Sequence, residues 1–168
     1  MVIFKSVFKI FIFDSRFVNS MKTDLVVGGY VIHKDKVLLI HHKKLDIWLP
    51  VGGHINENET PDQAVIREVK EEVGLDIEIL NHSNIPLEGN IRKNLSLPFY
   101  VNVHSVGDHD HCCFFYLCKT INPEELKINN EVKDCGWFSK EELNKPHVPA
   151  DVRNIALKAF ELFNKRKI

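Results

Sequence analysis

The sequence predicts a single α/β domain, because strand-like segments alternate with two helix patterns and nothing divides the chain. The strand-like segments are short runs rich in β-branched and aromatic residues. One helix pattern follows a glycine-rich segment near the middle of the chain, and the other lies near the C-terminus. The chain has 168 residues, of which 44% are hydrophobic and 27% are charged. A domain of this size buries roughly 70% of its unfolded surface, so it needs neither disulfides nor a structural metal.

The charge balance argues against a general affinity for polyanions. The 22 Lys and Arg residues nearly equal the 23 Asp and Glu residues, which gives a formal net charge of −1. No overall positive field therefore attracts DNA or a membrane surface, and long RNA is disfavoured as a partner. Four cysteines in a chain of this length do not indicate a disulfide scaffold, so we expect a reducing, cytoplasmic location.

The first 20 residues are predicted to be a dispensable extension of a domain that covers residues 21–168. The extension is apolar and aromatic, but Lys5 and Lys9 interrupt it before it reaches the length of a membrane span. It lacks a small-residue cleavage pattern, which disfavours a signal peptide. An added edge strand, an amphipathic surface helix and a segment upstream of a functional start at Met21 remain open. The extension could also serve a homodimer interface.

The pattern becomes regular after residue 24. Residues 25–32 and 37–42 are apolar runs on either side of a short polar turn, which predicts a β-hairpin. Residues 48–60 are rich in Pro, Gly and Asn and are predicted to form a loop. Further strands are predicted at 75–80, 99–104, 112–120 and 132–138, with a mostly irregular segment over 81–98.

Residues 60–74 carry a complete set of helix signals. Thr60 is a suitable N-cap, with Gln63 three residues later, and Pro61 fits the first helical position. Gly74 supplies the C-terminal stop. The residues expected to face the core are Val65, Ile66, Val69 and Val73.

A second helix is predicted from about residue 151 to residue 165. Ser139 and Glu142 repeat the capping pattern before it. Its apolar face consists of Val152, Ile155, Ala156, Ala159 and Phe163.

Three glutamates of the first helix, Glu68, Glu71 and Glu72, converge because they are spaced at i, i+3 and i+4. Each like-charge pair at these spacings costs roughly 0.2–0.5 kcal/mol, so a cation should offset the cluster. Arg67 lies beside it and could orient one or two carboxylates, whereas Lys70 points elsewhere. Oxygen ligands of this kind suit Mg²⁺, or Mn²⁺, better than Zn²⁺, and phosphate oxygens commonly complete the shell of Mg²⁺.

Two glycines precede the helix, and they allow the backbone to approach a ligand closely. Gly52 could aim its carbonyl at a cation, and Gly53 follows it. The alternative for the three glutamates is that they solvate an exposed helix face.

The segment from Gly53 to Leu75 resembles the signature of the Nudix hydrolase family at every defining position. These positions are Gly53, Glu59, the dipeptide Arg67–Glu68, the dipeptide Glu71–Glu72 and Gly74. The preceding hairpin, the residues Trp48 and Pro50, and the later run GWFSKEEL are also similar to the family, so that the resemblance covers roughly residues 25–143. One departure is Val51, which stands between Pro50 and the two glycines, where many members of the family have proline directly before glycine.

The resemblance implies an α/β/α sandwich around a mixed sheet and a Mg²⁺-dependent pyrophosphohydrolase that acts on phosphorus-containing acid anhydrides. It implies that Glu68, Glu71, Glu72 and the Gly52 carbonyl bind metal. Glu59 would pair with Arg67 to align the glutamates, and Glu131 is our candidate for a further acidic residue from a late loop. The general base stays open among Glu68, Glu71 and Glu131.

The implied substrate is a small nucleotide in which a nucleoside diphosphate is linked to another group. A nucleoside triphosphate, a nucleotide sugar, a dinucleoside polyphosphate and a capped RNA end all fit the same signature. The alternative from another class is a module that binds a nucleotide without cleaving it.

A cluster of histidines and cysteines lies in and before the strand predicted at 112–120. Strand alternation places His109, His111 and Cys113 on one face, and Cys112 and Cys118 on the other. Because no CxxC spacing is present, zinc is disfavoured at these residues, and we interpret the cysteines as packing residues. His109 or His111 could lie near a ligand, or could be solvated.

Several aromatic and basic residues have two readings. Trp48, Phe99 and Tyr100 could stack on a nucleobase or could belong to the core, and Trp137 is assigned to structure. The basic residues that could meet phosphates or could simply be solvated are Lys43, Lys44, Arg92 and Lys93.

Overall fold

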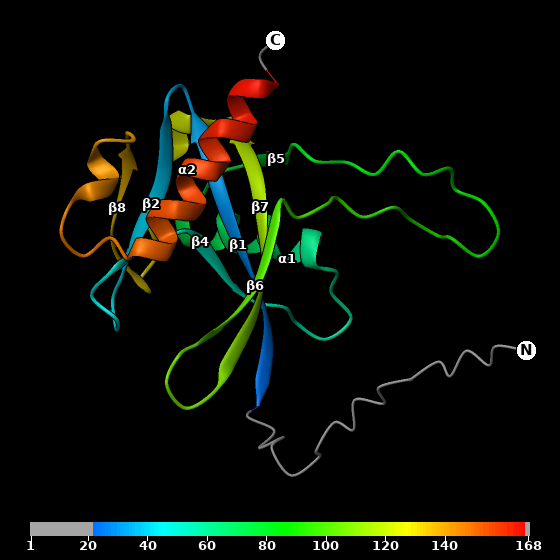
Figure 1. Ribbon diagram of the computed structural model, residues 1–168, viewed down its shortest axis with the longest axis horizontal. Coiled ribbons are helices and arrows are strands. Elements are labelled where there is room, and N and C mark those ends of the chain that lie inside the picture. The colour runs from blue at the N-terminus through cyan, green and yellow to red at the C-terminus, as the bar shows by residue number, and fades with distance from the viewer. Residues whose placement is uncertain (1–21, 167–168) are drawn as a thin grey trace, which may run out of the picture.

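A mixed β-sheet lies between two helices in the computed structural model, which describes residues 22–166 (Figure 1). Helix α1 (Pro61–Val73) packs on one face of the sheet, and helix α2 (Ala150–Lys165) crosses the other. This arrangement confirms the α/β/α sandwich. The predicted extension at residues 1–20 lies outside the described residues.

The sheet is built on a long central pair of strands. Strand β1 (Thr23–His33) forms the predicted antiparallel hairpin with β2 (Lys36–His42), and it pairs in parallel with β7 (Asp110–Thr120). Strands β5 (Ile77–Ile79) and β6 (Tyr100–Ser105) pair antiparallel with β7, and β8 (Val132–Phe138) pairs with β2. The strand predictions are therefore confirmed, with shifts of a few residues at their ends.

The prediction of a loop over residues 48–60 is wrong in its first half. The structure has two short strands there, β3 (Trp48–Leu49) and β4 (Val51–His54). Strand β4 pairs with β1 through two glycines on each strand, with Gly52 opposite Gly28. A Cβ atom at Gly52 would lie 2.1 Å from the Val27 carbonyl oxygen, so glycine is required for this close pairing.

The two helices cover separate hydrophobic clusters. Val65, Val69 and Val73 of α1 face the sheet as predicted, but Ile66 is 45% exposed, and this part of the prediction is wrong. Ile66 lies about 100° around the helix from Val65, at the border of the buried face, where it lines an open hollow along α1. On α2 the predicted face is buried except at its end, where Phe160 is buried and Phe163 is only half-buried.

The predicted cap residues form the expected contacts. Gln63 accepts the backbone N–H of Thr60 at 3.0 Å, and Gly74 has a left-handed φ of 72° and donates its N–H to the Lys70 carbonyl. The backbone N–H of Ser139 donates to the Glu142 carboxylate, and that of Glu142 donates to the Ser139 hydroxyl, although only a 3₁₀ turn (Glu142–Asn144) follows them. A second 3₁₀ turn spans Pro123–Glu125. Neither α1 nor α2 combines the length and the apolar run that crossing a membrane requires.

A buried hydrogen bond joins the central strand to α2, and its removal should cost stability. The Tyr30 hydroxyl donates to the Val152 carbonyl at 3.2 Å, and Tyr30 is fully buried. We expect Tyr30→Phe to lower the free energy of unfolding by about 1 kcal/mol, measured by urea denaturation. Tyr100→Phe is the control, since Tyr100 is 43% exposed. Equal losses in the two variants would contradict the assignment.

Candidate metal and catalytic site

Arg67, in the middle of α1, ties the helix to the loop that follows β4. Its guanidinium holds both carboxylate oxygens of Glu59, with Nε 2.8 Å from Oε1 and Nη2 2.9 Å from Oε2. Nη2 also donates to the His54 carbonyl at 2.9 Å. The Arg67 hydrogen bonds hold the pKa of Glu59 below its ordinary value. One arginine thus fixes the path of residues 54–59 against the helix.

The same guanidinium contacts two of the three clustered glutamates. Nη1 of Arg67 lies 2.7 Å from Oε1 of Glu68 and 3.1 Å from Oε2 of Glu71. Arg67 therefore offsets part of the repulsion, as the sequence predicts. The side chain of Glu68 is 14% exposed, and burial raises its pKa in spite of Arg67, whereas that of Glu71 is 58% exposed.

Glu72 is the most buried carboxylate of the three, at 7% exposure. Its Oε2 accepts the backbone N–H of Gly52 at 3.1 Å, and among residues 22–166 no lysine or arginine forms an ion pair with it. Burial, together with the charges of neighbouring glutamates, raises its pKa to about 7. A buried carboxylate without a cationic partner fits a divalent cation, since the cation would supply the missing charge.

A fourth carboxylate, that of Glu131, acts on the same group. Glu131 comes from the loop before β8, and its negative charge helps to raise the pKa of Glu72. Backbone hydrogen bonds hold this loop on the end of α1, with the Asn129 N–H donating to the Glu72 carbonyl at 3.0 Å. The structure therefore brings the predicted late-loop residue to the glutamate cluster. Its role as a ligand or base stays a prediction.

The glycines of β4 make room for the cluster. A Cβ atom at Gly53 would lie 2.5 Å from Oε1 of Glu68, so any side chain there would displace that carboxylate. Gly52 contributes its N–H to Glu72, and the assignment of its carbonyl as a metal ligand stays a prediction.

Comparisons with known proteins decide the family. The profile of the NUDIX domain matches residues 22–158, which include helix α1 and the eight strands of the described part of the chain. The chain belongs to the Nudix family. A solved Nudix hydrolase from Clostridium perfringens has a TM-score of 0.72 and 34% identity, over 83% of this chain and 97% of that chain.

Two curated relatives differ in the substrates that their names give. An RNA pyrophosphohydrolase from Hydrogenovibrio crunogenus is 40% identical over 108 residues, which are 61% of this chain and 63% of the relative. A dihydroneopterin triphosphate diphosphatase from Haemophilus influenzae is 29% identical over 151 residues, 85% of this chain and 89% of the relative. The alignment with the first relative thus spans less than two thirds of that protein.

Basic residues near the cluster in this Nudix domain have structural contacts of their own. Lys93 lies 3.2 Å from the buried carboxylate of Asp62, which anchors the long segment 81–98 to the first turn of α1. Lys43 donates to the Asn130 carbonyl at 3.3 Å, next to Glu131. Lys44 and Arg92 are exposed, as are Lys43 and Lys93.

The aromatic candidates belong mainly to the packing of the Nudix fold. Trp48 stacks on His41 with ring centroids 4.9 Å apart, and Phe99 packs edge-on against Tyr30 at 5.8 Å. Tyr100 stacks on Phe115 at 5.9 Å but remains 43% exposed.

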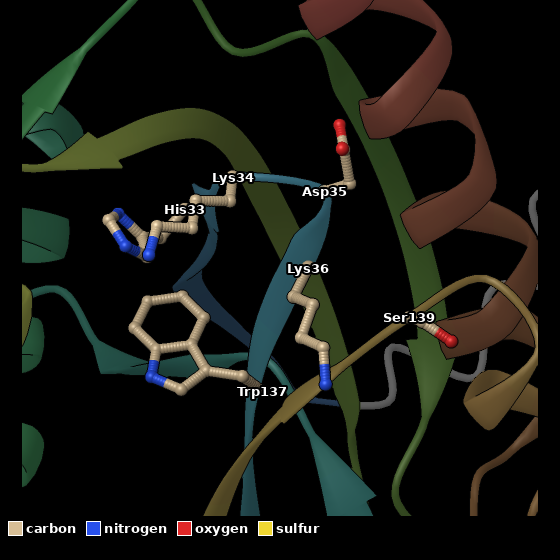
Figure 2. Close-up of a pocket in the computed structure, with 6 residues that line it drawn as sticks. All are labelled: His33, Lys34, Asp35, Lys36, Trp137 and Ser139. Carbon is tan, nitrogen blue, oxygen red and sulfur yellow. The ribbon is translucent and has the colours of Figure 1, made fainter.

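Two open hollows lie on the described surface. One, of about 650 Å³, runs along α1 and includes Glu71, Arg67 and Glu59 in its lining. The other, of about 480 Å³, lies at the β1–β2 turn, where the rings of His33 and Trp137 are 5.6 Å apart (Figure 2). Trp137 lies near the opposite end of β8 from Glu131, roughly 20 Å away along the strand, so this second hollow is separate from the glutamate cluster.

The raised pKa of Glu72 gives a prediction about metal affinity. The carboxyl is protonated in most folded molecules below about pH 7. Its ordinary pKa is 4.5, so the stability that the folded state gains by holding this proton is lost as the pH rises from 4.5 to about 7. Mg²⁺ needs the ionised form, and we expect its dissociation constant to be on the order of tenfold larger at pH 6 than at pH 8. Calorimetric titration measures both values. A Glu72→Gln variant should lose the difference, and equal constants in the unaltered protein would contradict the prediction.

Proposed function

We propose that this protein is a Mg²⁺-dependent hydrolase that cleaves the diphosphate linkage of a nucleoside diphosphate derivative. The observation that carries the proposal is the buried Glu72 carboxylate, which has no cationic partner among the described residues and lies beside three further carboxylates. Diphosphates carry several negative charges, which these carboxylates would repel without a cation. Mg²⁺ between them would neutralise phosphate charge and lower the pKa of a coordinated water.

The residues of the chain have separate tasks in this reaction. Glu68, Glu71 and Glu72 hold the metal, and Arg67 keeps the first two carboxylates in place while it anchors Glu59. One of Glu68, Glu71 and Glu131 takes the proton from the attacking water. The partly exposed Glu71 borders the open groove along α1, through which a phosphate chain can approach.

The named relatives support two substrate classes. The similarity to an RNA pyrophosphohydrolase supports RNA as the substrate, and the similarity to a dihydroneopterin triphosphate diphosphatase supports a small triphosphate. The net charge of −1 supports the small nucleotide, because long RNA binds through many phosphate contacts with basic residues. We therefore propose a small nucleotide as substrate.

The test is turnover of a nucleotide panel in the presence of Mg²⁺. The panel contains nucleoside triphosphates, nucleotide sugars, dinucleoside polyphosphates and a short 5′-triphosphorylated RNA, and released phosphate or nucleotide is measured for each. Cleavage of a small nucleotide supports the proposal, and preference for the RNA overturns the substrate class. Binding across the panel without turnover would favour the alternative, a nucleotide-binding module without catalytic activity.

A further inference from the structure

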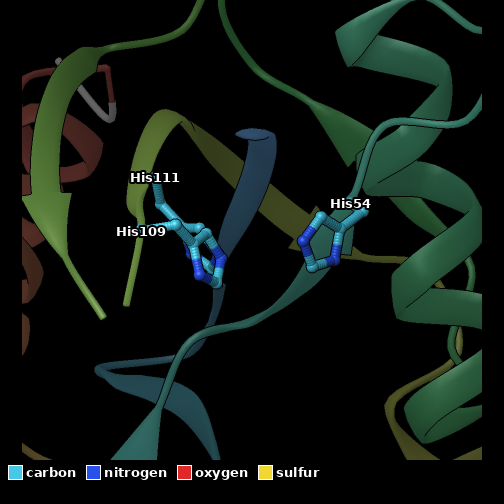
Figure 3. A group of neighbouring side chains, drawn as sticks. All are labelled: His54, His109 and His111. Carbon is cyan, nitrogen blue, oxygen red and sulfur yellow. The ribbon is translucent and has the colours of Figure 1, made fainter. Parts of the chain in front are cut away.

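Three histidines that are far apart in the sequence meet on the sheet surface away from the glutamate cluster. They are His54 at the end of β4, His109 just before β7 and His111 within β7. One ring nitrogen of each lies within 4.8 Å of the others, and Figure 3 shows the ring of His54 turned toward the other two rings. Strand alternation predicts that His109 and His111 share a face with Cys113, but it does not include His54. The contribution of His54 depends on strand pairing, which the sequence alone does not give.

The strand register explains why these rings share one face. His111 lies opposite Asp24 of β1, and His54 lies opposite Val26, two residues further along the same strand. Alternate residues of a strand point to the same face, and Val26 belongs to the cluster that α2 covers. His54 therefore points to the opposite face from Gly53, which lies against Glu68 of α1. The histidines and the glutamates occupy opposite faces of the sheet.

The distance between two of the ring nitrogens is close to the distance between two histidine nitrogens that bind the same metal ion. Nε2 of His109 and Nε2 of His111 are 3.1 Å apart. Zn²⁺ binds histidine nitrogen at about 2.0–2.1 Å, so a tetrahedral ion holds two such nitrogens about 3.3 Å apart. His54 must approach the other two rings by up to about 1.5 Å to share the ion. Its side chain is 60% exposed, and its ring already lies 5.3 Å from that of His111.

Neighbouring carboxylates favour a cation at this position. Oδ1 of Asp108 lies 2.7 Å from Nδ1 of His109, an arrangement that holds the proton on Nδ1 and leaves the lone pair of Nε2 available. Oδ2 of Asp24 lies 3.5 Å from Nε2 of His109 and 3.7 Å from Nε2 of His54. Lys22 also contacts this oxygen at 3.0 Å, but its side chain is 76% exposed and can move away. Two carboxylates beside the rings would repel a phosphate.

We propose that His54, His109 and His111 bind one Zn²⁺ ion, with Asp24 or a solvent molecule as the fourth ligand. Imidazole nitrogens suit Zn²⁺, whereas the all-oxygen cluster of Glu68, Glu71 and Glu72 suits Mg²⁺, so the two sites select different ions. Three histidines with one remaining position form a donor set typical of zinc sites that keep an exchangeable ligand.

The site would also restrain the loop that Arg67 holds. The His54 carbonyl accepts a hydrogen bond from Nη2 of Arg67, while its side chain faces the proposed ion on the other face. An ion bound to His54 and His111 would therefore link β4 to β7 across β1 and fix the backbone from which the loop at 55–59 begins.

The experiment is a calorimetric titration of the full chain with Zn²⁺ in excess Mg²⁺, which keeps the glutamates occupied. We expect one Zn²⁺ per chain. The dissociation constant should be at least tenfold larger in each of His54→Ala, His109→Ala and His111→Ala. Even loss of a residue that only hydrogen-bonds to a metal ligand weakens binding by about tenfold or more, and loss of a ligand itself should cost no less. His82→Ala is the matched control, because His82 is an exposed histidine of the segment 81–98. Circular dichroism without metal shows whether each variant is folded.

A second measurement distinguishes one four-coordinate metal site from weak binding to separate surface histidines. Co²⁺ in place of Zn²⁺ should give the intense visible absorption of a four-coordinate ion, and this absorption should disappear in His109→Ala. The proposal is overturned if folded variants bind Zn²⁺ as tightly as the unaltered protein, if His82→Ala weakens binding equally, or if Co²⁺ shows only the weak absorption of a six-coordinate ion. Binding that Glu72→Gln abolishes would place the ion at the glutamates and would likewise overturn it.

Discussion

Glu72→Gln is expected to lower the turnover of a diphosphate-linked nucleotide by at least 100-fold, with the fold intact. Glutamine keeps the size of the side chain and can still accept the Gly52 N–H, so the hydrogen bond at 3.1 Å need not be lost. It removes the negative charge that would bind the cation. Because Glu72 is buried without a lysine or arginine partner among residues 22–166, we expect no other described group to replace that charge. Initial rates at saturating substrate and Mg²⁺ measure the effect.

The same substitution should not destabilise the metal-free protein. Burial raises the pKa of Glu72 to about 7, so near neutral pH the charged form is disfavoured in the folded state. A neutral glutamine should therefore leave the midpoint of urea unfolding unchanged or raise it slightly. Glu78→Gln is the matched control, because Glu78 is an exposed strand residue paired with Lys119. Turnover of Glu72→Gln within a few-fold of that control would remove Glu72 from the catalytic set.

The limits of α1 could be predicted from the sequence because its signals are local. Thr60, Pro61 and Gly74 act within one turn of the helix ends. The helix begins at Pro61, directly after Thr60, and ends at Val73, directly before Gly74. The convergence of the glutamates could be predicted for the same reason, since it follows from helical spacing. Arg67 was correctly placed beside them on this basis.

Features that depend on strand pairing could not be predicted in this way. Strand β4 has the composition of a loop, and it pairs with β1 because Gly52 allows the two backbones to approach. The histidine cluster has the same origin. Alternation predicts that His109 and His111 share a face, but only the register of β4 on β1 adds His54. Ile66 shows a further limit, because helical spacing alone does not tell which residues at the border of the buried face are covered.

Arg67→Ala is expected to lower both stability and turnover, because one side chain holds the loop and the carboxylates together. It removes the two-point contact with Glu59, the hydrogen bond to the His54 carbonyl and the contacts with Glu68 and Glu71. The side chains of Arg67 and Glu59 are 25% and 14% exposed, so these contacts are partly shielded from water. We expect the free energy of unfolding to fall by about 2 kcal/mol and turnover by about 100-fold.

A double-mutant cycle with Glu59→Gln isolates the pair from the other contacts of Arg67. We expect a coupling energy of about 1–2 kcal/mol in urea denaturation, since the planar guanidinium matches both carboxylate oxygens. Arg67→Lys should recover only part of the lost turnover, because an ammonium group keeps the charge but cannot donate two parallel hydrogen bonds to one carboxylate as a planar guanidinium does. Arg153→Ala on α2 is the matched control, with one hydrogen bond of 3.4 Å to Asn144. Zero coupling would show that the Arg67–Glu59 pair does not stabilise the fold. Full recovery of turnover by lysine would show that charge alone matters at this position and that the geometry of the pair does not.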